Sequence, residues 1–308
     1  MAEPRGVCAG VDRAVKIVDE ALARFGPPIY VRHEIVHNQH IVGNFRKRGV
    51  TFVDELNEVP EGSTVIFSAH GVAPSVHEEA KRRNLRAIDA TCPLVSKVHN
   101  EVVRFADKGA HLVLIGHEGH EEVIGTMGHA PDSTTLVTNT VDANRVTFPE
   151  GAELFVVTQT TLSLDDTAEI LAVLKRRFPQ MQRPKSDDIC YATQNRQNAV
   201  KEISGDIDLL LIIGSDNSSN AKRLVEVGRS RGVKAYLVDN ETMVDPAWLE
   251  GVQTVGISAG ASTPEELVKR VLSRLQELGA TDVKTRVTVE EKVIFNLPPE
   301  LAHSQNNS

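Results

Sequence analysis

The sequence predicts an α/β protein whose parallel sheets are covered by helices on both faces. Short runs rich in Val, Ile and Leu alternate with amphipathic helical patterns along almost the whole chain. These runs are apolar nearly throughout rather than at every second position, which is typical of parallel strands buried on both faces. The length of 308 residues is enough for two or three domains of this kind.

The expected elements follow one another in a regular order. In chain order the strands are 29–32, 64–67, 86–88, 111–115, 154–157, 208–213, 234–238 and 254–257. The helices are 12–25, 93–106, 163–177, 191–203 and 262–278. Ser163 and Asp166 have the spacing of a capping box, with Asp in the place of Glu, and Pro264 lies in the first turn of the last helix.

Five of the strands end in loops of small polar residues, Gly and His. The loops are 68–71, 116–120, 158–161, 214–220 and 258–262. In open α/β sheets, ligands bind at the carboxyl ends of the strands. Five loops of this composition therefore predict one composite pocket. The Ser-rich loop 214–220 could simply cap the helix that follows it. Alternatively, this loop and 258–262 each open a helix, and the two helix N-termini could bind one anion such as a diphosphate.

The three cysteines, Cys8, Cys92 and Cys190, are widely spaced and each lies near the start of an expected helix. The odd count and the lack of a secretory signal argue against a disulfide framework, and there is no C-x-x-C pair. They could be three separate buried thiols. Alternatively, three similar lobes, 1–91, 92–189 and 190–281, each deliver one thiolate to a shared centre, with 282–308 as a C-terminal extension. Three thiolates suit an iron-sulfur cluster better than catalytic zinc, and leave one iron of a cubane open.

The segment GHEGHEE, 116–122, has the composition of a metal site. However, zincins carry H-E-x-x-H on a helix, whereas His117 and His120 are three apart and Gly119 interrupts a helix. A solvated turn is one alternative. An active-site loop that supplies an acid and a hydrogen-bond donor is the preferred interpretation. His37 and His70 could each be structural, and His70, which follows a strand, is the stronger functional candidate.

Composition and charge exclude some classes of partner. The net charge is −8 and no basic face is evident, which argues against binding to duplex nucleic acid. No apolar stretch is long enough to span a membrane, and the start of the chain has no apolar signal core. A cytoplasmic protein without a membrane partner is therefore expected.

Eight motifs follow one another along the chain. They are PRGVCAGVDRA (4–14), YVRHEIVHN (30–38), FSAHGV (67–72), DATCPLV (89–95), GHEGH (116–120), TQTTLS (158–163), DDICYAT (187–193) and NSSN (217–220). Together these motifs closely resemble the LytB/IspH family of 4-hydroxy-3-methylbut-2-enyl diphosphate reductases. The resemblance extends from about residue 3 to about residue 301, with every motif in order.

The resemblance implies an enzyme of the last step of the non-mevalonate isoprenoid pathway. Two electrons and two protons remove the C4 hydroxyl of the allylic diphosphate as water, giving isopentenyl and dimethylallyl diphosphates. The implied fold is three α/β lobes around a pseudo-three-fold axis, with a 4Fe-4S cluster at the centre. An electron donor such as ferredoxin or flavodoxin is implied as a partner.

The resemblance also assigns roles to individual residues. Cys8, Cys92 and Cys190 would hold the cluster, and its open iron would take the substrate hydroxyl. Glu122 matches the proton donor, with Thr160 beside it in the relay. The residues matching the diphosphate and substrate contacts are His37, His70, His120, Thr160, Ser218, Ser219, Asn220 and Ser262. No family role carries over to His117, Glu118 or Glu121.

The two ends of the chain differ from the family pattern, and two other functions are also considered. Family members have an apolar strand before the P-R-G-x-C motif, whereas only Met1-Ala2-Glu3 precedes it here. The sequence therefore does not predict whether the first strand of one lobe is present. The polar tail after Leu301 is expected to be disordered. The alternative functions are a zinc hydrolase centred on His117 and His120 and a non-catalytic binder of a phosphorylated metabolite.

Overall fold

The computed structural model describes residues 1–302. The chain divides into two compact units, each described by itself. The first unit comprises Met1–Val11, His37–Ile41 and Tyr191–Ile294. The second comprises Asp12–Val36, Val42–Cys190 and the described residues from Phe295 onward. Most of the polar tail, 303–308, lies outside the described residues, so its expected disorder stays a prediction.

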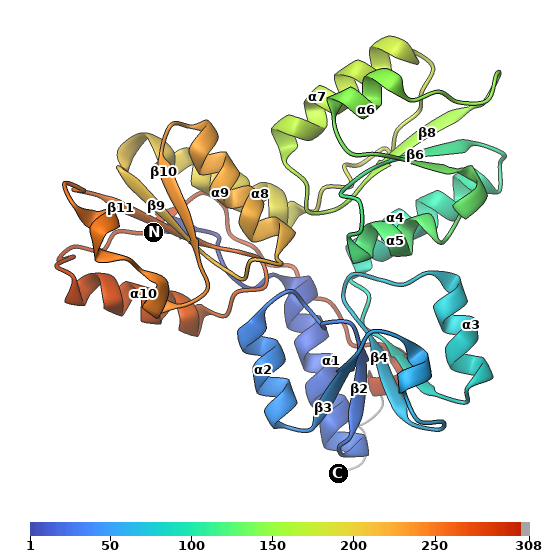
Figure 1. Ribbon diagram of the computed structural model, residues 1–308, viewed down its shortest axis with the longest axis horizontal. Coiled ribbons are helices and arrows are strands. Elements are labelled where there is room, and N and C mark those ends of the chain that lie inside the picture. Colours follow the sequence, from blue (N-terminus) through green and yellow to red (C-terminus); the bar gives the residue numbers. More distant parts are fainter. Residues whose placement is uncertain (303–308) are drawn as a thin grey trace. The chain divides into compact units, whose positions relative to one another are not determined.

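The second unit contains a four-stranded parallel sheet in the order β3-β2-β4-β5. The strands are β2 (Ile29–Arg32), β3 (Val50–Val53), β4 (Thr64–Phe67) and β5 (Arg86–Asp89). Figure 1 shows α3 (Pro74–Arg82) on one side of this sheet and α1 (Ala9–Phe25) and α2 (Gln39–Lys47) on the other. On the α3 side, Val65 and Phe67 pack with Ala80. The sheet is thus buried on both faces, as its apolar strands predict.

A second parallel sheet in the same unit has three strands in the order β7-β6-β8. These are β6 (His111–Ile115), β7 (Thr134–Val137) and β8 (Leu154–Thr158). Successive residues of β6 face opposite sides, so Leu112 and Leu114 pack on the side of α4 (Pro93–Ala106) and α5 (Glu121–Met127). Val113 and Ile115 pack on the side of α6 (Thr140–Arg145) and α7 (Leu164–Arg177). Figure 1 shows these helix pairs on opposite sides of the sheet.

The first unit is built around a parallel sheet in the order β10-β9-β11. Its strands are β9 (Leu209–Ile213), β10 (Lys234–Val238) and β11 (Val255–Ala259). Leu210 and Ile212 pack beneath α8 (Tyr191–Ile203) and α9 (Ser219–Ser230). The alternate residues of β9 pack against α10 (Glu265–Glu277) on the other face.

The remaining elements are short. In the first unit, β1 (Ala2–Glu3) pairs in parallel with β12 (Arg286–Val287). The last described helix is α11 (Pro299–Ala302). The 3-10 helices are η1 (Leu56–Glu58), η2 (Pro131–Ser133), η3 (Ser204–Asp206), η4 (Glu241–Met243) and η5 (Pro246–Leu249).

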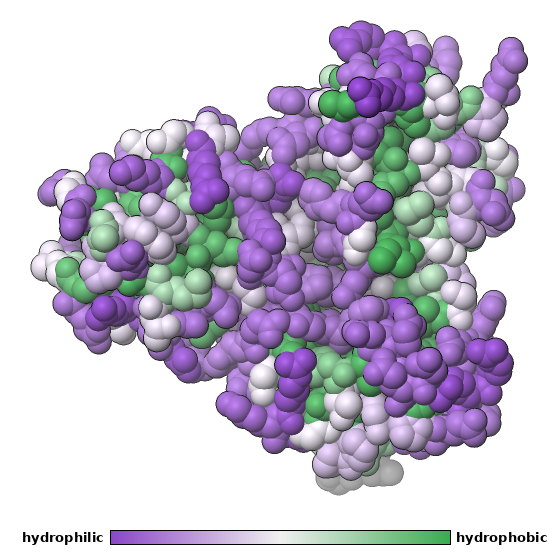
Figure 2. Space-filling view, in the orientation of Figure 1, coloured by the Kyte–Doolittle hydropathy of each residue, from purple (hydrophilic) through white to green (hydrophobic). Residues whose placement is uncertain are grey.

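The predicted α/β class with parallel sheets is confirmed. Ser163 caps α7 as its spacing predicts, since its side chain accepts from the amide of Asp166 at 3.1 Å. In the part of the chain that the structure describes, no helix is long and apolar enough to cross a bilayer. Hydrophilic side chains cover most of the face drawn in Figure 2, as expected when the apolar residues are used between sheets and helices.

Candidate functional site

All three cysteines lie where a helix begins. Cys8 directly precedes α1, Cys92 is the N-cap residue of α4, and Cys190 directly precedes α8. All three are partly buried thiols rather than disulfides. A helix start carries unpaired backbone amides and the positive end of the helix dipole. Cys8 belongs to the first unit, whereas Cys92 and Cys190 belong to the second.

The same main-chain hydrogen bond fixes each cysteine. The amides of Cys8, Cys92 and Cys190 donate to the carbonyls of Ala261, Ala69 and Thr160, each at 3.0 Å. Each carbonyl belongs to the second residue after a strand, since β11, β4 and β8 end two residues earlier. The three thiols are therefore presented in the same way at the carboxyl ends of three different sheets.

A glycine makes this arrangement possible at Cys8. Gly6 donates its amide to the carbonyl of Ala259 at 3.2 Å and has a φ of +66°. A Cβ at this position would lie 2.9 Å from the carbonyl oxygen of Thr263. Gly6 therefore permits both the left-handed backbone and the close approach of the Cys8 loop to the end of β11.

The carboxylate of Glu122 is buried and held by Thr160. The side chain is 2% exposed, and the amide and hydroxyl of Thr160 donate to Oε1 and Oε2 at 2.6 and 2.9 Å. The carbonyl of the same Thr160 accepts from the amide of Cys190. One residue thus connects an acid and a thiol that are far apart in sequence.

His120 and His70 stand beside this acid in the second unit. His120 is the N-cap residue of α5, and its Nδ1 accepts from the amide of Glu122 at 3.1 Å. Its ring meets that of His70 edge to face, with 5.9 Å between the ring centroids. Nδ1 of His70 lies 3.2 Å from Oε2 of Glu121 and 3.3 Å from Oγ of Ser68. The loops after β4 and β6 therefore meet, as the strand-end argument predicts.

The remaining predicted site residues lie in the first unit. Ser262 donates its hydroxyl to the carbonyl of His37 at 2.8 Å, which brings these two predicted residues into contact. Ser218 caps α9 by accepting from the amide of Ala221 at 3.3 Å. The members of this group are His37, Ser218, Ser219, Asn220 and Ser262, together with Cys8.

The segment GHEGHEE, 116–122, on which the zinc hypothesis rests, does not have the form of a metal site. Gly119 has a φ of +76° and α5 starts only at Glu121, so His117 and His120 do not share a helix. The amide of His117 is bound to the side chain of Gln159 at 3.0 Å. Within residues 1–302, no three His, Cys, Asp or Glu side chains form a group that could hold one ion. The backbone of this loop, which places His117 outside the helix, counts against the zinc hydrolase.

The match to a family model decides the relationship of the chain to known proteins. Residues 1–276 match the model described as LytB protein. The chain belongs to the LytB family. A 4-hydroxy-3-methylbut-2-enyl diphosphate reductase of Mycolicibacterium paratuberculosis is 56% identical over 302 residues, which is 98% of this chain and 91% of the relative. The reductase of Aromatoleum aromaticum is 56% identical over 98% of this chain and 96% of its own length.

Solved structures of this family have the same fold. The E-1-hydroxy-2-methyl-but-2-enyl-4-diphosphate reductase of Plasmodium falciparum matches with a TM-score of 0.95 at 42% identity, over 98% of this chain and 95% of that chain. A second structure is described as (E)-4-hydroxy-3-methyl-but-2-enyl diphosphate reductase, the terminal enzyme of the non-mevalonate pathway. It matches with a TM-score of 0.65 at 35% identity, over 90% of this chain and 98% of that one.

The three cysteine thiols of this LytB chain fit a cubane iron-sulfur cluster better than a single metal ion. In a cubane each thiolate binds a different iron, so the ligands lie at separate corners and need not converge on one point. Three thiols presented alike, each at a helix start, would suit such a cluster.

Sequence reasoning missed the residues that support the Cys190 segment. Asp188 is buried, accepts from the amide of Thr158 at 3.0 Å and pairs with Lys97 at 3.1 Å. Burial and the neighbouring carboxylate of Asp188 raise the pKa of Glu101. The signal available in the sequence is an acidic residue, Asp188, two positions before the predicted ligand Cys190.

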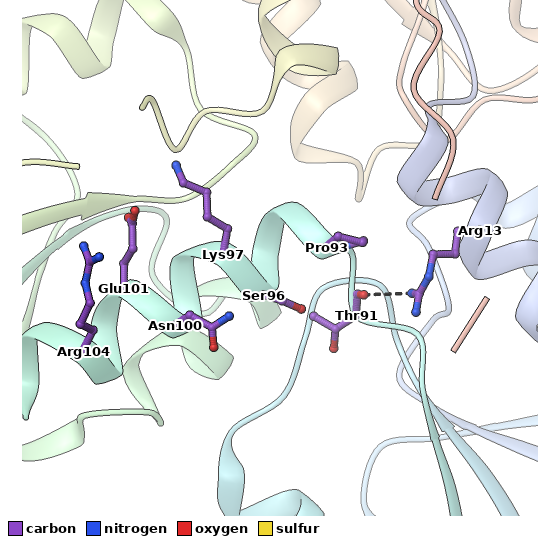
Figure 3. A pocket seen from close by; sticks show the side chains of 8 residues that line it. All are labelled: Arg13, Thr91, Pro93, Ser96, Lys97, Asn100, Glu101 and Arg104. Atoms are coloured by element: carbon purple, nitrogen blue, oxygen red, sulfur yellow. Dashed lines mark hydrogen bonds between the residues drawn. The ribbon is translucent and has the colours of Figure 1, made fainter. Parts of the chain in front are cut away.

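A cavity of about 480 Å³ runs along α4 in the second unit (Figure 3). Arg13 lies at one end and donates to the carbonyl of Thr91 at 3.0 Å. Lys97, Glu101 and Arg104 follow one another along the helix. None of the predicted substrate or cluster residues lines this cavity, whose lining residues are Arg13, Thr91, Pro93, Ser96, Lys97, Asn100, Glu101 and Arg104. It is therefore distinct from the candidate site.

Proposed function

We propose that this chain reduces (E)-4-hydroxy-3-methylbut-2-enyl diphosphate to isopentenyl and dimethylallyl diphosphates. The reaction takes up two electrons and two protons, breaks the C4–O bond, forms one C–H bond and releases the oxygen as water. It is the last step of the non-mevalonate isoprenoid pathway. The observation that carries the proposal is the buried Glu122, held by the residue whose carbonyl also holds Cys190.

The proposed cofactor is a 4Fe-4S cluster held by Cys8, Cys92 and Cys190, with one iron open. When bound, it supplies the electrons and a Lewis-acidic iron for the substrate hydroxyl. The chain contributes three cysteine side chains whose main-chain positions are fixed by three equivalent hydrogen bonds from the cysteine amides. A ferredoxin or flavodoxin is the proposed electron donor. We also propose the lobe division 1–91, 92–189 and 190–281, with 282–308 as an extension, supported by one parallel sheet within each lobe.

The proposed proton donor is Glu122. Its two carboxylate oxygens are held separately by the amide and the hydroxyl of Thr160, so the acid has one orientation. A proton that leaves Glu122 for the departing hydroxyl can be replaced through the Thr160 hydroxyl, which is 2.9 Å from Oε2. Burial excludes water that would otherwise compete as a proton donor.

The proposed diphosphate ligands need no Lys or Arg. They are His37, His70, His120, Ser218, Ser219, Asn220 and Ser262, and Thr160 is the substrate contact beside Glu122. Hydroxyls, an amide and imidazoles can all donate to phosphate oxygens. A chain with a net charge of −8 can therefore still bind a diphosphate locally. The cytoplasmic location expected from the sequence stays a prediction.

Anaerobic purification followed by iron and sulfide analysis tests the proposal. We expect about four irons and four sulfides per chain, and conversion of the allylic diphosphate when a strong reductant is supplied. Bound zinc without labile sulfide would support the hydrolase instead. A metal-free protein that binds the diphosphate without reducing it would support the non-catalytic binder.

A further inference from the structure

Glu121, for which the family resemblance supplies no role, lies between two histidines of the second unit. Its Oε2 is 3.2 Å from Nδ1 of His70, and its Oε1 is 3.4 Å from Nδ1 of His33. The three side chains are 23%, 14% and 26% exposed, in the order Glu121, His70 and His33. They form a carboxylate bridge between two rings, at the edge of the candidate site.

Each member of this bridge comes from a different segment. His33 follows β2, has a φ of +57° and donates its amide to the carbonyl of Val53 at 2.7 Å. His70 follows β4, and Glu121 is the first residue of α5. The bridge therefore joins loops from both sheets of the unit, and its members are fixed by their own backbones rather than by the bridge alone.

We propose that Glu121 is a positioning residue for His70, a role that rests on the proposed function. A carboxylate oxygen of Glu121 lies 3.2 Å from Nδ1 of His70, where its charge favours a proton on that nitrogen and leaves Nε2 for the diphosphate of the substrate. A carboxylate that faces Nδ1 of a histidine restricts the tautomer and the orientation of the ring. His33 holds the other oxygen of the carboxylate, which keeps Glu121 from turning away from His70.

Because Glu121 is negatively charged, it could also weaken diphosphate binding by direct repulsion. A carboxylate near a diphosphate repels it unless the carboxylate acts through a cationic or strongly donating partner. Positioning through His70 predicts that removal of the charge weakens diphosphate binding. Simple repulsion predicts that the same change strengthens binding. The sign of the effect therefore distinguishes the two.

The three glutamates of the 116–122 segment differ enough to provide a matched control. Glu122 is buried against Thr160, Glu121 is paired with two histidines, and Glu118 is exposed in the same loop. Glu118→Gln makes the same chemical change as Glu121→Gln without touching the bridge. Glu121→Asp keeps the charge but shortens the side chain, and it should recover part of the effect.

The first measurement is the binding of inorganic diphosphate to the anaerobically purified protein by calorimetry, together with steady-state kinetics. For Glu121→Gln we expect diphosphate binding weaker by about tenfold, KM for the substrate higher by a similar factor, and kcat within about twofold. Glu118→Gln should match the wild type in all three. Equal or tighter diphosphate binding by Glu121→Gln would overturn the proposal. Because diphosphate binding needs no turnover, this result is obtained even if the protein fails to reduce the substrate.

A double-mutant cycle shows whether Glu121 acts through His70. In a His70→Asn background, Glu121→Gln should change diphosphate binding by less than about twofold, because the partner is already absent. A full tenfold effect in that background would refute positioning through His70. Far-ultraviolet circular dichroism and the melting temperature test whether each variant is folded. If Glu121→Gln does not fold, Glu121→Asp is compared with the wild type instead.

Discussion

The amide and the hydroxyl of Thr160 both donate to the carboxylate of Glu122, at 2.6 and 2.9 Å. The first bond belongs to the main chain and survives any substitution of Thr160 other than proline. The second depends on the side chain alone. Substitution at Thr160 can therefore remove the hydroxyl while leaving the acid anchored.

Thr160→Val should lower turnover by about tenfold or more while leaving diphosphate binding nearly unchanged, because it removes the hydroxyl from the proposed relay. The free energy of unfolding should fall by about 1 to 2 kcal/mol, since a buried carboxylate oxygen loses a donor. Thr160→Ser keeps the hydroxyl and serves as the control. Equal turnover of the Val and Ser variants would exclude the hydroxyl from the reaction. Steady-state kinetics and urea denaturation provide the two measurements.

Glu122→Gln tests the acid itself. Gln has nearly the same shape but cannot release a carboxylic proton, so turnover should fall by roughly a hundredfold to ten-thousandfold. Iron content and diphosphate affinity should stay close to those of the wild type. The exposed Glu118→Gln variant of the same loop is the control for non-specific effects. Near-normal turnover by Glu122→Gln would remove this residue from the mechanism.

Arg196 should be important for the stability of the Cys8 loop. Its side chain is 1% exposed, donates to the carbonyl of Gly6 from Nε and Nη2 at 3.0 and 2.7 Å, and pairs with Glu291 at 3.0 Å. Arg196→Met should lower the free energy of unfolding by about 3 kcal/mol, because Glu291 and the Gly6 carbonyl lose their partner. The thiol of Cys8 in cluster-free protein should also be alkylated faster.

Arg183→Met is the matched control for that experiment. Arg183 also pairs with a carboxylate, that of Asp187, but its side chain is 62% exposed. An exposed pair contributes little, so this variant should change the free energy of unfolding by less than about 1 kcal/mol. Similar losses in both variants would show that Arg196 does not act through its buried contacts.

The stability of the protein should depend on pH through His99. Burial, with a smaller contribution from His129, lowers the pKa of His99 from 6.5 to about 3. The unfolded state therefore binds this proton first, so the stabilisation is present above pH 6.5 and is lost as the pH falls toward 3. Between pH 6 and pH 4 this loss should be about 2 to 3 kcal/mol.

Comparison with His99→Asn isolates this contribution from those of other histidines. The variant lacks the titrating ring, so its free energy of unfolding should fall less steeply between pH 6 and pH 4 than that of the wild type. His40→Asn, at a partly exposed histidine of the first unit, controls for the substitution. Parallel pH profiles of the wild type and His99→Asn, measured by urea denaturation at each pH, would contradict the prediction.

Much of the fold could be predicted because most buried strands are continuous apolar runs. The expected strand 111–115 and the observed β6 coincide, and 208–213 differs from β9 by one residue. The strands β3 and β7 were not predicted. Both lie at sheet edges and carry threonines, as at Thr51 and Thr135, so neither shows the continuous apolar pattern. The arrangement of lobes around a pseudo-three-fold axis stays a prediction.

The candidate site was predicted as a set of residues but not as a set of contacts. The family resemblance selected Glu122 and Thr160, and the spacing of the cysteines together with the resemblance selected the three thiols. It could not show that Thr160 holds both Glu122 and Cys190, because these bonds connect residues brought together only by the packing of the second unit. The pairing of Glu121 with His33 and His70 depends on three separate loops and had no signal in the local sequence.

The bond that fixes each thiol also determines which genetic changes the site can tolerate. The carbonyls that receive the cysteine amides belong to Ala69, Thr160 and Ala261, and a carbonyl is present whatever the side chain. Small substitutions at positions 69 and 261 should thus be neutral. Deletion of one residue between a strand and its carbonyl would shift the turn by one position and leave the cysteine amide without its acceptor. The length of these loops, rather than their composition, should therefore be the constrained property.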